Sequence, residues 1–250
     1  MSPDISHILR DWPYRSGEVT ARKIIGQDGR EKIQLRLDLG ILQMEAVGRP
    51  DGQRPNGHES LLDYYQKQFQ RHRVETGSDE GFNLDEQACE LLRGEGIMYY
   101  HRYLAMFVLE DFEAVERDVL RNLRLFDFCR LYAAEESDRF VLEQFRPYVH
   151  MMLARARALT ALRDNRPKAA LVAVKEGMSS IREFHRRFGR EKETEQSAEY
   201  TMLMGLGKEI ESRLPADPVQ RVRSELAKAV REERYEEAAM LRDQLKQLRK

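Results

Sequence analysis

The sequence has few of the residues that mark disulfide-linked, metal-bound or membrane-spanning proteins. Its 250 residues include two cysteines and one tryptophan. No stretch approaches the roughly 18 consecutive apolar residues that a membrane-spanning helix needs. The first residues, Met-Ser-Pro-Asp-Ile-Ser, lack the basic flank and apolar stretch of a secretory signal. We therefore expect a cytosolic protein.

An excess of charge of one sign is also missing. The chain holds 42 Lys and Arg against 43 Asp and Glu, so 34% of it is charged at a net charge of -1. This balance excludes a polybasic binder and a disordered acidic tail. With 41% hydrophobic residues, the length is sufficient for one large domain or two smaller ones.

The two cysteines, Cys89 and Cys129, lie within apolar helical patterns and have no Cys or His neighbour at metal-ligand spacing. We predict two buried free thiols. A disulfide between them is the alternative, which a reducing cytosol disfavours.

Sequence motifs of common enzymes are absent. There is no Gly-x-Ser-x-Gly, His-Glu-x-x-His or Cys-x-x-Cys, no dinucleotide fingerprint and no phosphate-binding loop of the Walker type. His101, His150 and His185 lie in helical patterns, where a lone histidine is more often packed or solvated than catalytic. We predict a protein that is not an enzyme, with no cofactor and no metal.

Residues 1–58 are predicted to form a small antiparallel β region that ends in a Gly/Pro loop. Residues 18–25 and 31–39 flank Gly26–Arg30, whose Asp-Gly pair favours a tight turn. After Gly40 the apolar phase shifts, which indicates a bend before a third strand. The alternation of residues 31–39 places four apolar residues on one face of a strand, namely Ile33, Leu35, Leu37 and Leu39.

Residues 59–214 are predicted to form a bundle of stacked helical hairpins, which makes the fold mainly α (α+β). Short polar links at 109–112 and 162–167, about 53 residues apart, each precede an apolar helical stripe. This weakly resembles tetratricopeptide-type hairpins, although that repeat is about 34 residues long. The aromatic stretch from Tyr99 to Phe112 is predicted to fill a hairpin core. The expected helices span 60–74, 84–109, 112–132, 137–163, 167–187, 192–213, 218–231 and 235–248.

Two groups of basic residues are candidates for contact with an anion or a nucleic acid. Arg guanidinium groups and amides at a helix start suit phosphate, but Gly/Pro loops and helix faces are often simply solvated and basic. An enzyme built around the loop from Arg49 to Glu59 is a further alternative. The first group is Arg49, Arg54 and His58 in the loop, and the second is Arg182, Arg186 and Arg190 on a helix.

The last 34 residues, 217–250, are predicted to form a short antiparallel hairpin. Asp217 and Pro218 make a favourable helix start, and Glu232–Arg234 is a charged break between two apolar stripes. A hairpin of this size has little core of its own. It is expected to pack on other helices or on a partner.

Residues 226–248 resemble the UVR motif of the excision-repair proteins UvrB and UvrC, which also occurs in Clp-type chaperones and their adaptors. Tyr-Glu at 235, Ala-Ala at 238 and Leu-Arg-Asp at 241 stand where that family has its aromatic-Glu, Ala-Ala and Leu-Arg-Asp. The resemblance implies a protein-interaction hairpin. Its expected contact residues are Tyr235, Glu236, Ala238, Ala239, Leu241, Arg242, Asp243 and Leu245.

Outside this hairpin the chain lacks UvrB's helicase motifs, UvrC's nuclease segments and the Cys-x-x-Cys pairs of zinc-binding chaperone adaptors. Its N-terminal segment, from Asp4-Ile-Ser-His to His58-Glu-Ser-Leu-Leu, is similar to bacterial proteins that end in this motif and have no assigned activity. The leading hypothesis is a non-enzymatic adaptor or scaffold whose residues 217–250 bind a protein, for which the resemblance implies a UvrB/UvrC-like or Clp-type partner. Self-association stays open. The alternative is a nucleic-acid-associated accessory protein of DNA excision repair that contacts phosphates through its basic residues.

Overall fold

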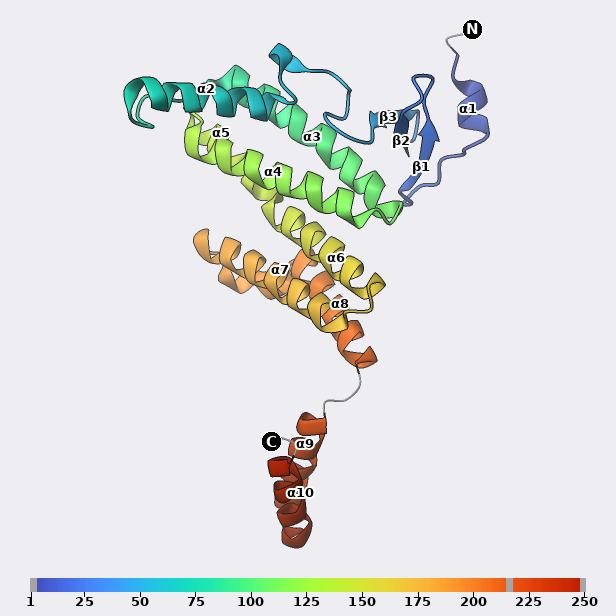
Figure 1. Ribbon diagram of the computed structural model, residues 1–250, viewed down its shortest axis with the longest axis vertical. Coiled ribbons are helices and arrows are strands. Elements are labelled where there is room, and N and C mark those ends of the chain that lie inside the picture. Colours follow the sequence, from blue (N-terminus) through green and yellow to red (C-terminus); the bar gives the residue numbers. More distant parts are fainter. Residues whose placement is uncertain (1–3, 215–217, 248–250) are drawn as a thin grey trace. The chain divides into compact units, whose positions relative to one another are not determined.

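The computed structural model describes residues 4–214 and 218–247. The chain forms two compact units, residues Met1–Gly207 and Lys208–Lys250, which we call the body and the terminal unit. The fold is mainly helical, with a three-stranded N-terminal sheet and a C-terminal helical pair (Figure 1), as the sequence predicts. In the described residues, no helix is both long enough and apolar enough to cross a membrane.

The sheet is an antiparallel meander in the order β1-β2-β3. Its strands are β1 (Thr20–Ile25), β2 (Glu31–Arg36) and β3 (Ile41–Glu45). The predicted hairpin is confirmed: Gly29 has a positive φ of 75°, a conformation that glycine adopts without steric cost. Its amide donates to the Gly26 carbonyl over 3.0 Å.

Strand β2 is shorter than predicted, because the chain turns after Arg36. The Leu37 amide donates to the Gly40 carbonyl over 2.9 Å, and the Gly40 amide returns a bond to the Leu37 carbonyl over 3.4 Å. Ile33 and Leu35 are buried as expected, whereas Leu37 and Leu39 are exposed. The prediction that all four share one buried face was therefore wrong for the two leucines beyond the strand.

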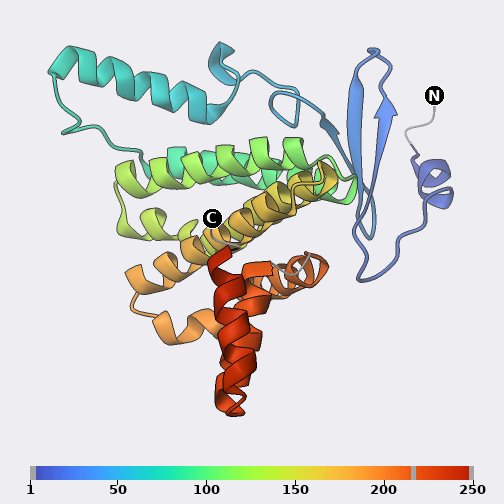
Figure 2. The same ribbon diagram turned by 60° about the horizontal axis from the view of Figure 1, so that its bottom comes forward.

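Both faces of β2 are covered. Helix α3 (Glu86–Val108) packs against β1 and β2 on one side. The N-terminal segment with α1 (Ser6–Arg10), which the sequence did not predict, lies on the other side (Figures 1 and 2). There Arg36 Nε donates to the Trp12 carbonyl over 2.7 Å, and the Arg22 guanidinium lies 4.4 Å from the centroid of the Trp12 ring.

The helices of the body pack in series. Helix α3 packs on α4, α4 on α6, and α6 on α7. Ser60 caps α2, because the Asp63 amide donates to Ser60 Oγ over 3.0 Å. The aromatic core is confirmed, with Tyr99, Tyr103 and Phe112 buried. The bounds are α2 (Leu61–Thr76), α4 (Phe112–Tyr132), α5 (Glu136–Phe140), α6 (Arg146–Arg163), α7 (Pro167–Arg187) and α8 (Ala198–Arg213), with short 3-10 turns at Pro55–Gly57, Glu143–Phe145 and Glu191–Gln196.

Two predicted helices are interrupted at their N-terminal ends. The predicted helix 137–163 is divided into α5, a 3-10 turn and α6, since Pro147 in the first turn of α6 cannot continue a helix from the preceding residues. The predicted helix 192–213 starts only at Ala198. Ser197 precedes it and accepts the Tyr200 amide over 3.3 Å, a capping contact that marks a helix start.

Three helical hairpins share one type of connection. In each, three residues join the helices and the second adopts the left-handed conformation: Glu110 (φ 58°), Asn165 (φ 56°) and Glu233 (φ 57°). The amide of the third residue then donates to the carbonyl five residues before it, over 3.0, 2.7 and 2.9 Å respectively. This is the Schellman-type helix end. It occurs between α3 and α4, between α6 and α7, and in the terminal unit.

Helices α6, α7 and α8 approach closely at Gly177 on α7. A Cβ atom there would lie 2.4 Å from Ala154 Cβ and 3.0 Å from Leu203 Cδ1. Glycine is therefore required by packing, and a side chain at this position would force the helices apart.

Candidate functional site

The terminal unit contains a two-helix hairpin of α9 (Pro218–Arg231) and α10 (Tyr235–Gln247). Helix α9 begins at Pro218 as predicted; its predicted cap, Asp217, lies outside the described residues, as does Leu248 of the predicted stripe. The two helices pack on each other. Val222, Ala229 and Ala238 are buried, and Leu226, Leu241 and Leu245 are half-buried.

Apolar side chains also remain uncovered on this hairpin. Tyr235 is 67% exposed and Met240 is 68% exposed, and Val230 in the last turn of α9 is exposed too. Tyr235 and Met240 border a shallow depression of about 620 Å³ at the connection between the helices, together with Glu233, Arg234, Glu236 and Glu237. We call Val230, Tyr235 and Met240 the apolar tip of the hairpin.

Charged side chains surround the apolar tip. Arg234 pairs with Glu232 at 2.5 Å and with Glu237, and Arg242 pairs with Asp243 at 3.2 Å. These pairs are exposed, so each contributes little to stability. The two alanines that were expected to contact a partner differ in exposure, since Ala238 is buried and Ala239 is exposed.

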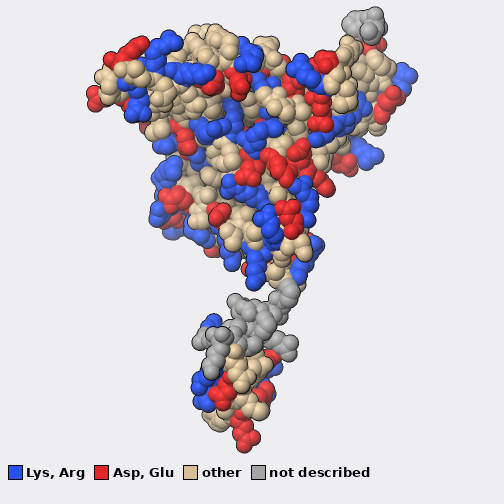
Figure 3. Space-filling model, in the orientation of Figure 1, with Lys and Arg blue, Asp and Glu red and all other residues tan. Residues whose placement is uncertain are grey.

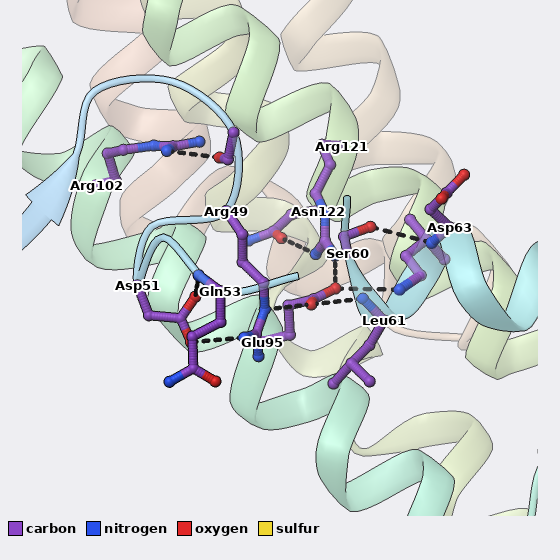
Figure 4. Close-up of polar contacts among 12 residues, drawn as sticks. Arg49, Asp51, Gln53, Ser60, Leu61, Asp63, Glu95, Arg102, Arg121 and Asn122 are labelled. Atoms are coloured by element: carbon purple, nitrogen blue, oxygen red, sulfur yellow. Dashed lines mark hydrogen bonds and ion pairs between the residues drawn. The ribbon is translucent and has the colours of Figure 1, made fainter. Parts of the chain in front are cut away.

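The Gly/Pro loop is held against α3 by a buried carboxylate (Figure 4). Glu95 on α3 is fully buried and accepts the Leu61 and Leu62 amides at the start of α2 over 2.7 and 3.1 Å. It also pairs with Arg49 at 2.9 Å and with Arg121 of α4. An internal anion therefore occupies this helix N-terminus.

The three loop residues predicted as anion contacts have separate environments. Arg49 has a side chain that is 9% exposed and pairs with Asp51 at 2.5 Å in addition to Glu95. His58 Nδ1 lies 3.5 Å from an Asp63 carboxylate oxygen. Arg54 is exposed, and its guanidinium makes no hydrogen bond or ion pair with any residue in the described part of the chain.

The three basic residues around α7 all have protein partners. Arg182 donates to the Tyr200 hydroxyl over 2.5 Å. Arg186 pairs with Glu183, and Arg190 pairs with Glu193, each at 2.5 Å. On the face drawn in Figure 3, basic and acidic side chains are interspersed across the body. Local carboxylates thus offset much of the charge of this group.

Several charged residues in the core were not predicted from the sequence. Arg102 of α3 and Asp118 of α4 are buried and form a bidentate pair at 2.6 and 2.9 Å. Arg102 also donates to the Glu45 and Gly48 carbonyls over 3.0 and 2.7 Å. The spacing of these residues could have revealed them. Four residues follow one another at helical spacing on a single buried face, namely Leu92, Glu95, Tyr99 and Arg102.

The cysteines are buried as predicted, His185 is buried, and His101 and His150 are half-buried. Cys89 and Cys129 are buried and free, and a hydrogen bond with Cys89 together with burial raises the pKa of the Cys129 thiol. Burial lowers the pKa of His101 and lowers that of His150 to about 4. Among the described residues, no cluster of His, Cys, Asp and Glu is arranged to hold a metal ion.

Comparison with known proteins identifies the hairpin alone. Residues 217–250 match the family model of the UvrB/uvrC motif, UVR. No curated protein matches the chain, and no solved structure matches it. The chain thus carries a UVR motif, a protein-interaction hairpin, in its terminal unit.

Proposed function

We propose that this protein is a non-enzymatic adaptor that binds another protein through the apolar tip of its UVR hairpin. The observation that carries the proposal is the exposure of Tyr235 and Met240 on a hairpin that belongs to a motif used for protein interaction. Large apolar side chains that a small folded unit leaves exposed together are typical of an interface. The body would then serve as the scaffold or carry the second binding function of the adaptor.

The geometry indicates how such an interface would be organised. Aromatic and methionine side chains are the usual anchors of protein interfaces, and a polar rim surrounds them. Here Tyr235 and Met240 are the anchors, and Arg234, Glu236 and Glu237 form the rim. The fitting partner presents an apolar groove with charges of both signs at its edge, such as the surface of another helical pair.

The test compares two substitutions in the full-length chain. Tyr235→Ala with Met240→Ala removes the anchors, and Val74→Ala removes a valine of α2 that is 85% exposed on the body. Partners are captured from a bacterial lysate, quantified by mass spectrometry and then titrated in purified form. Loss of an anchor of this type costs at least about 2 kcal/mol, or roughly thirtyfold in affinity.

Circular dichroism is the control for folding, because both substitutions replace exposed residues and should leave helix content unchanged. The proposal requires that the double substitution removes a captured protein that the Val74→Ala variant retains. If both variants capture the same proteins with the same affinity as the unmodified chain, the adaptor proposal is wrong.

A second candidate function is that of an accessory protein in DNA excision repair, which the occurrence of the motif in UvrB and UvrC supports. The carboxylate partners of Arg186 and Arg190 argue against strong phosphate contact by that group. Binding to a duplex or a single strand at about 50 mM salt, with an affinity that falls steeply as salt is added, would support this function. Absence of such binding would exclude this second function and leave the adaptor function as the remaining proposal.

A further inference from the structure

A pocket in the body lies where the loop after β3 meets α3 and α4. Its volume is about 470 Å³, within the range of small-molecule sites. The charged residues that line it carry a formal excess of four positive charges, which falls to two when the buried Glu95 and the loop residue Asp51 are included. The lining arginines are Arg30, Arg49, Arg54, Arg102, Arg117, Arg121 and Arg124, and the lining carboxylates are Glu45, Glu59 and Asp118.

Five of these arginines have carboxylate partners, and one of the five, Arg121, is described below. Arg102 and Arg117 both pair with Asp118, and Arg102 also binds the loop carbonyls described above. Arg49 pairs with Glu95 and Asp51. Arg30 pairs with Asp28 at 2.8 Å. Arg49 and Arg102, whose side chains are 9% and 1% exposed, form the fixed wall of the pocket.

Arg54 and Arg124 have no carboxylate partner, and Arg121 keeps one donor free beside its pair with Glu95. Arg54 and Arg124 are exposed, and neither guanidinium makes a hydrogen bond or an ion pair within the described residues. Arg121 is different, because its side chain is only 8% exposed and its buried Nε has no hydrogen-bond partner among the described atoms. A buried donor without an acceptor costs about 1–3 kcal/mol. A ligand oxygen at this position would remove that cost.

The charge of Arg121 favours an anionic ligand. Burial, with smaller contributions from Arg124 and Arg49, lowers the pKa of Arg121 to about 9. The guanidinium stays protonated at neutral pH, because this lowered pKa is still above 7. Its carboxylate partner Glu95 is shared with Arg49. One carboxylate thus serves two guanidinium groups and the start of α2.

We propose that this pocket binds the phosphate groups of a small phosphorylated molecule. Arg121 Nε would contact a phosphate oxygen inside the pocket, and Arg54 and Arg124 would contact the remaining charge at its mouth. Several guanidinium donors around one site suit the tetrahedral phosphate, which offers acceptors in several directions. A diphosphate suits this arrangement, because one phosphate group can reach the buried donor while the other contacts the two exposed donors.

The ring of Tyr99 helps to define the ligand. The Arg121 guanidinium lies 4.0 Å from its centroid, and that of Arg102 lies 4.9 Å from it. The ring is therefore covered by cations and is not available to stack on a base. Glu45 and Glu59 also line the pocket, which disfavours an extended polyanion. Both features favour a compact phosphate ligand over a nucleic-acid strand.

The test is calorimetric titration of the full-length protein with pyrophosphate and with inorganic phosphate, in about 50 mM salt where screening is weak. We expect pyrophosphate to bind with a Kd below about 1 mM and more tightly than inorganic phosphate. Arg54→Gln with Arg124→Gln should weaken pyrophosphate binding by about tenfold or more. The matched control is Arg186→Gln with Arg190→Gln, which removes two exposed arginines elsewhere on the body and should leave the affinity unchanged.

Arg54 and Arg124 are exposed and unpaired, so their substitution leaves the fold intact and the test remains decisive where an Arg121 variant fails to fold. No binding of pyrophosphate at about 10 mM, or equal affinity in the Arg54/Arg124 variant and the unmodified chain, would overturn the proposal. So would a single-stranded oligonucleotide that binds more tightly than pyrophosphate and loses its affinity in the same variant. Failure of this test would leave the adaptor proposal untouched, since the hairpin is not involved.

Discussion

The hairpins of the body and the hairpin of the terminal unit share a connection but differ in what covers them. Glu110, Asn165 and Glu233 occupy the same left-handed position in three-residue links. In the body, α4 packs on α3 along one side and on α6 along another. On the terminal hairpin, Tyr235 and Met240 remain about two-thirds exposed.

The comparison separates two kinds of sequence information. The link residues determine that two helices form an antiparallel pair, whatever surrounds the pair. The residues on the outer face determine whether the pair becomes part of a core or remains available for a partner. In the body this outer face carries buried charges and small residues; in the terminal unit it carries an aromatic residue, a methionine and exposed ion pairs.

The largest expected effect contrasts the ion pairs of the two regions. Asp118→Asn removes the charge partner of the buried Arg102, and we expect the free energy of unfolding of the body to fall by about 3–5 kcal/mol. Asp243→Asn breaks the exposed pair with Arg242 and should change stability by less than about 0.5 kcal/mol. Urea denaturation followed by circular dichroism measures both. Similar effects of the two substitutions would contradict the difference between the buried ion pair of the body and the exposed ion pair of the terminal unit.

A second effect concerns pH and arises only in the body, because residues 208–250 contain no histidine. The pKa of His150 is about 4 in the folded body against about 6.5 when unfolded. Between these values the unfolded state binds more protons, so stability is lost as pH falls from about 7 to 5, by about 1–2 kcal/mol for this residue.

Thermal or urea unfolding at the two pH values measures this loss. His150→Gln should reduce the difference between pH 7 and pH 5, and His7→Gln, on the exposed N-terminal helix, should leave it unchanged. An equal pH dependence in the unmodified chain and the His150→Gln variant would contradict the assignment.

The smallest expected effect tests the left-handed connection that the hairpins share. Glycine tolerates the left-handed conformation, whereas a residue with a Cβ atom adopts it at a cost. We expect Asn165→Gly and Glu233→Gly each to stabilise its own unit by about 0.5–1 kcal/mol, as measured by thermal denaturation. A gain in one unit and a loss in the other would show that the two connections are not equivalent.

The sequence predicted those parts of the fold that depend on neighbouring residues. The Asp-Gly turn before β2 and the polar links between helices act within a few positions, and each was found at or near its predicted place. The UVR hairpin was predicted for the same reason, since its pattern is short and continuous. The errors lie where a tight turn or a single proline ends an apolar pattern, as after Arg36 and at Pro147.

The candidate sites show the same limit. Arg49 and Arg54 were singled out because they share a loop, but Arg49 is neutralised by Glu95, which lies 46 positions away. Arg121 and Arg124 were not singled out, because a helix pattern does not show which loop it faces. Only the packing of α3, α4 and the loop brings the free donors of Arg54, Arg121 and Arg124 into one pocket.

The packing of the single tryptophan has a practical consequence for spectroscopy. Trp12 is half-buried against the sheet, beside Arg22 and Arg36, and the terminal unit contains no tryptophan. Indole fluorescence therefore reports on the N-terminal segment and its sheet, while the terminal hairpin contributes to the far-ultraviolet signal without emitting in that band. Recording both signals in one denaturation experiment distinguishes the melting of the N-terminal segment and its sheet from the loss of helix in the whole chain.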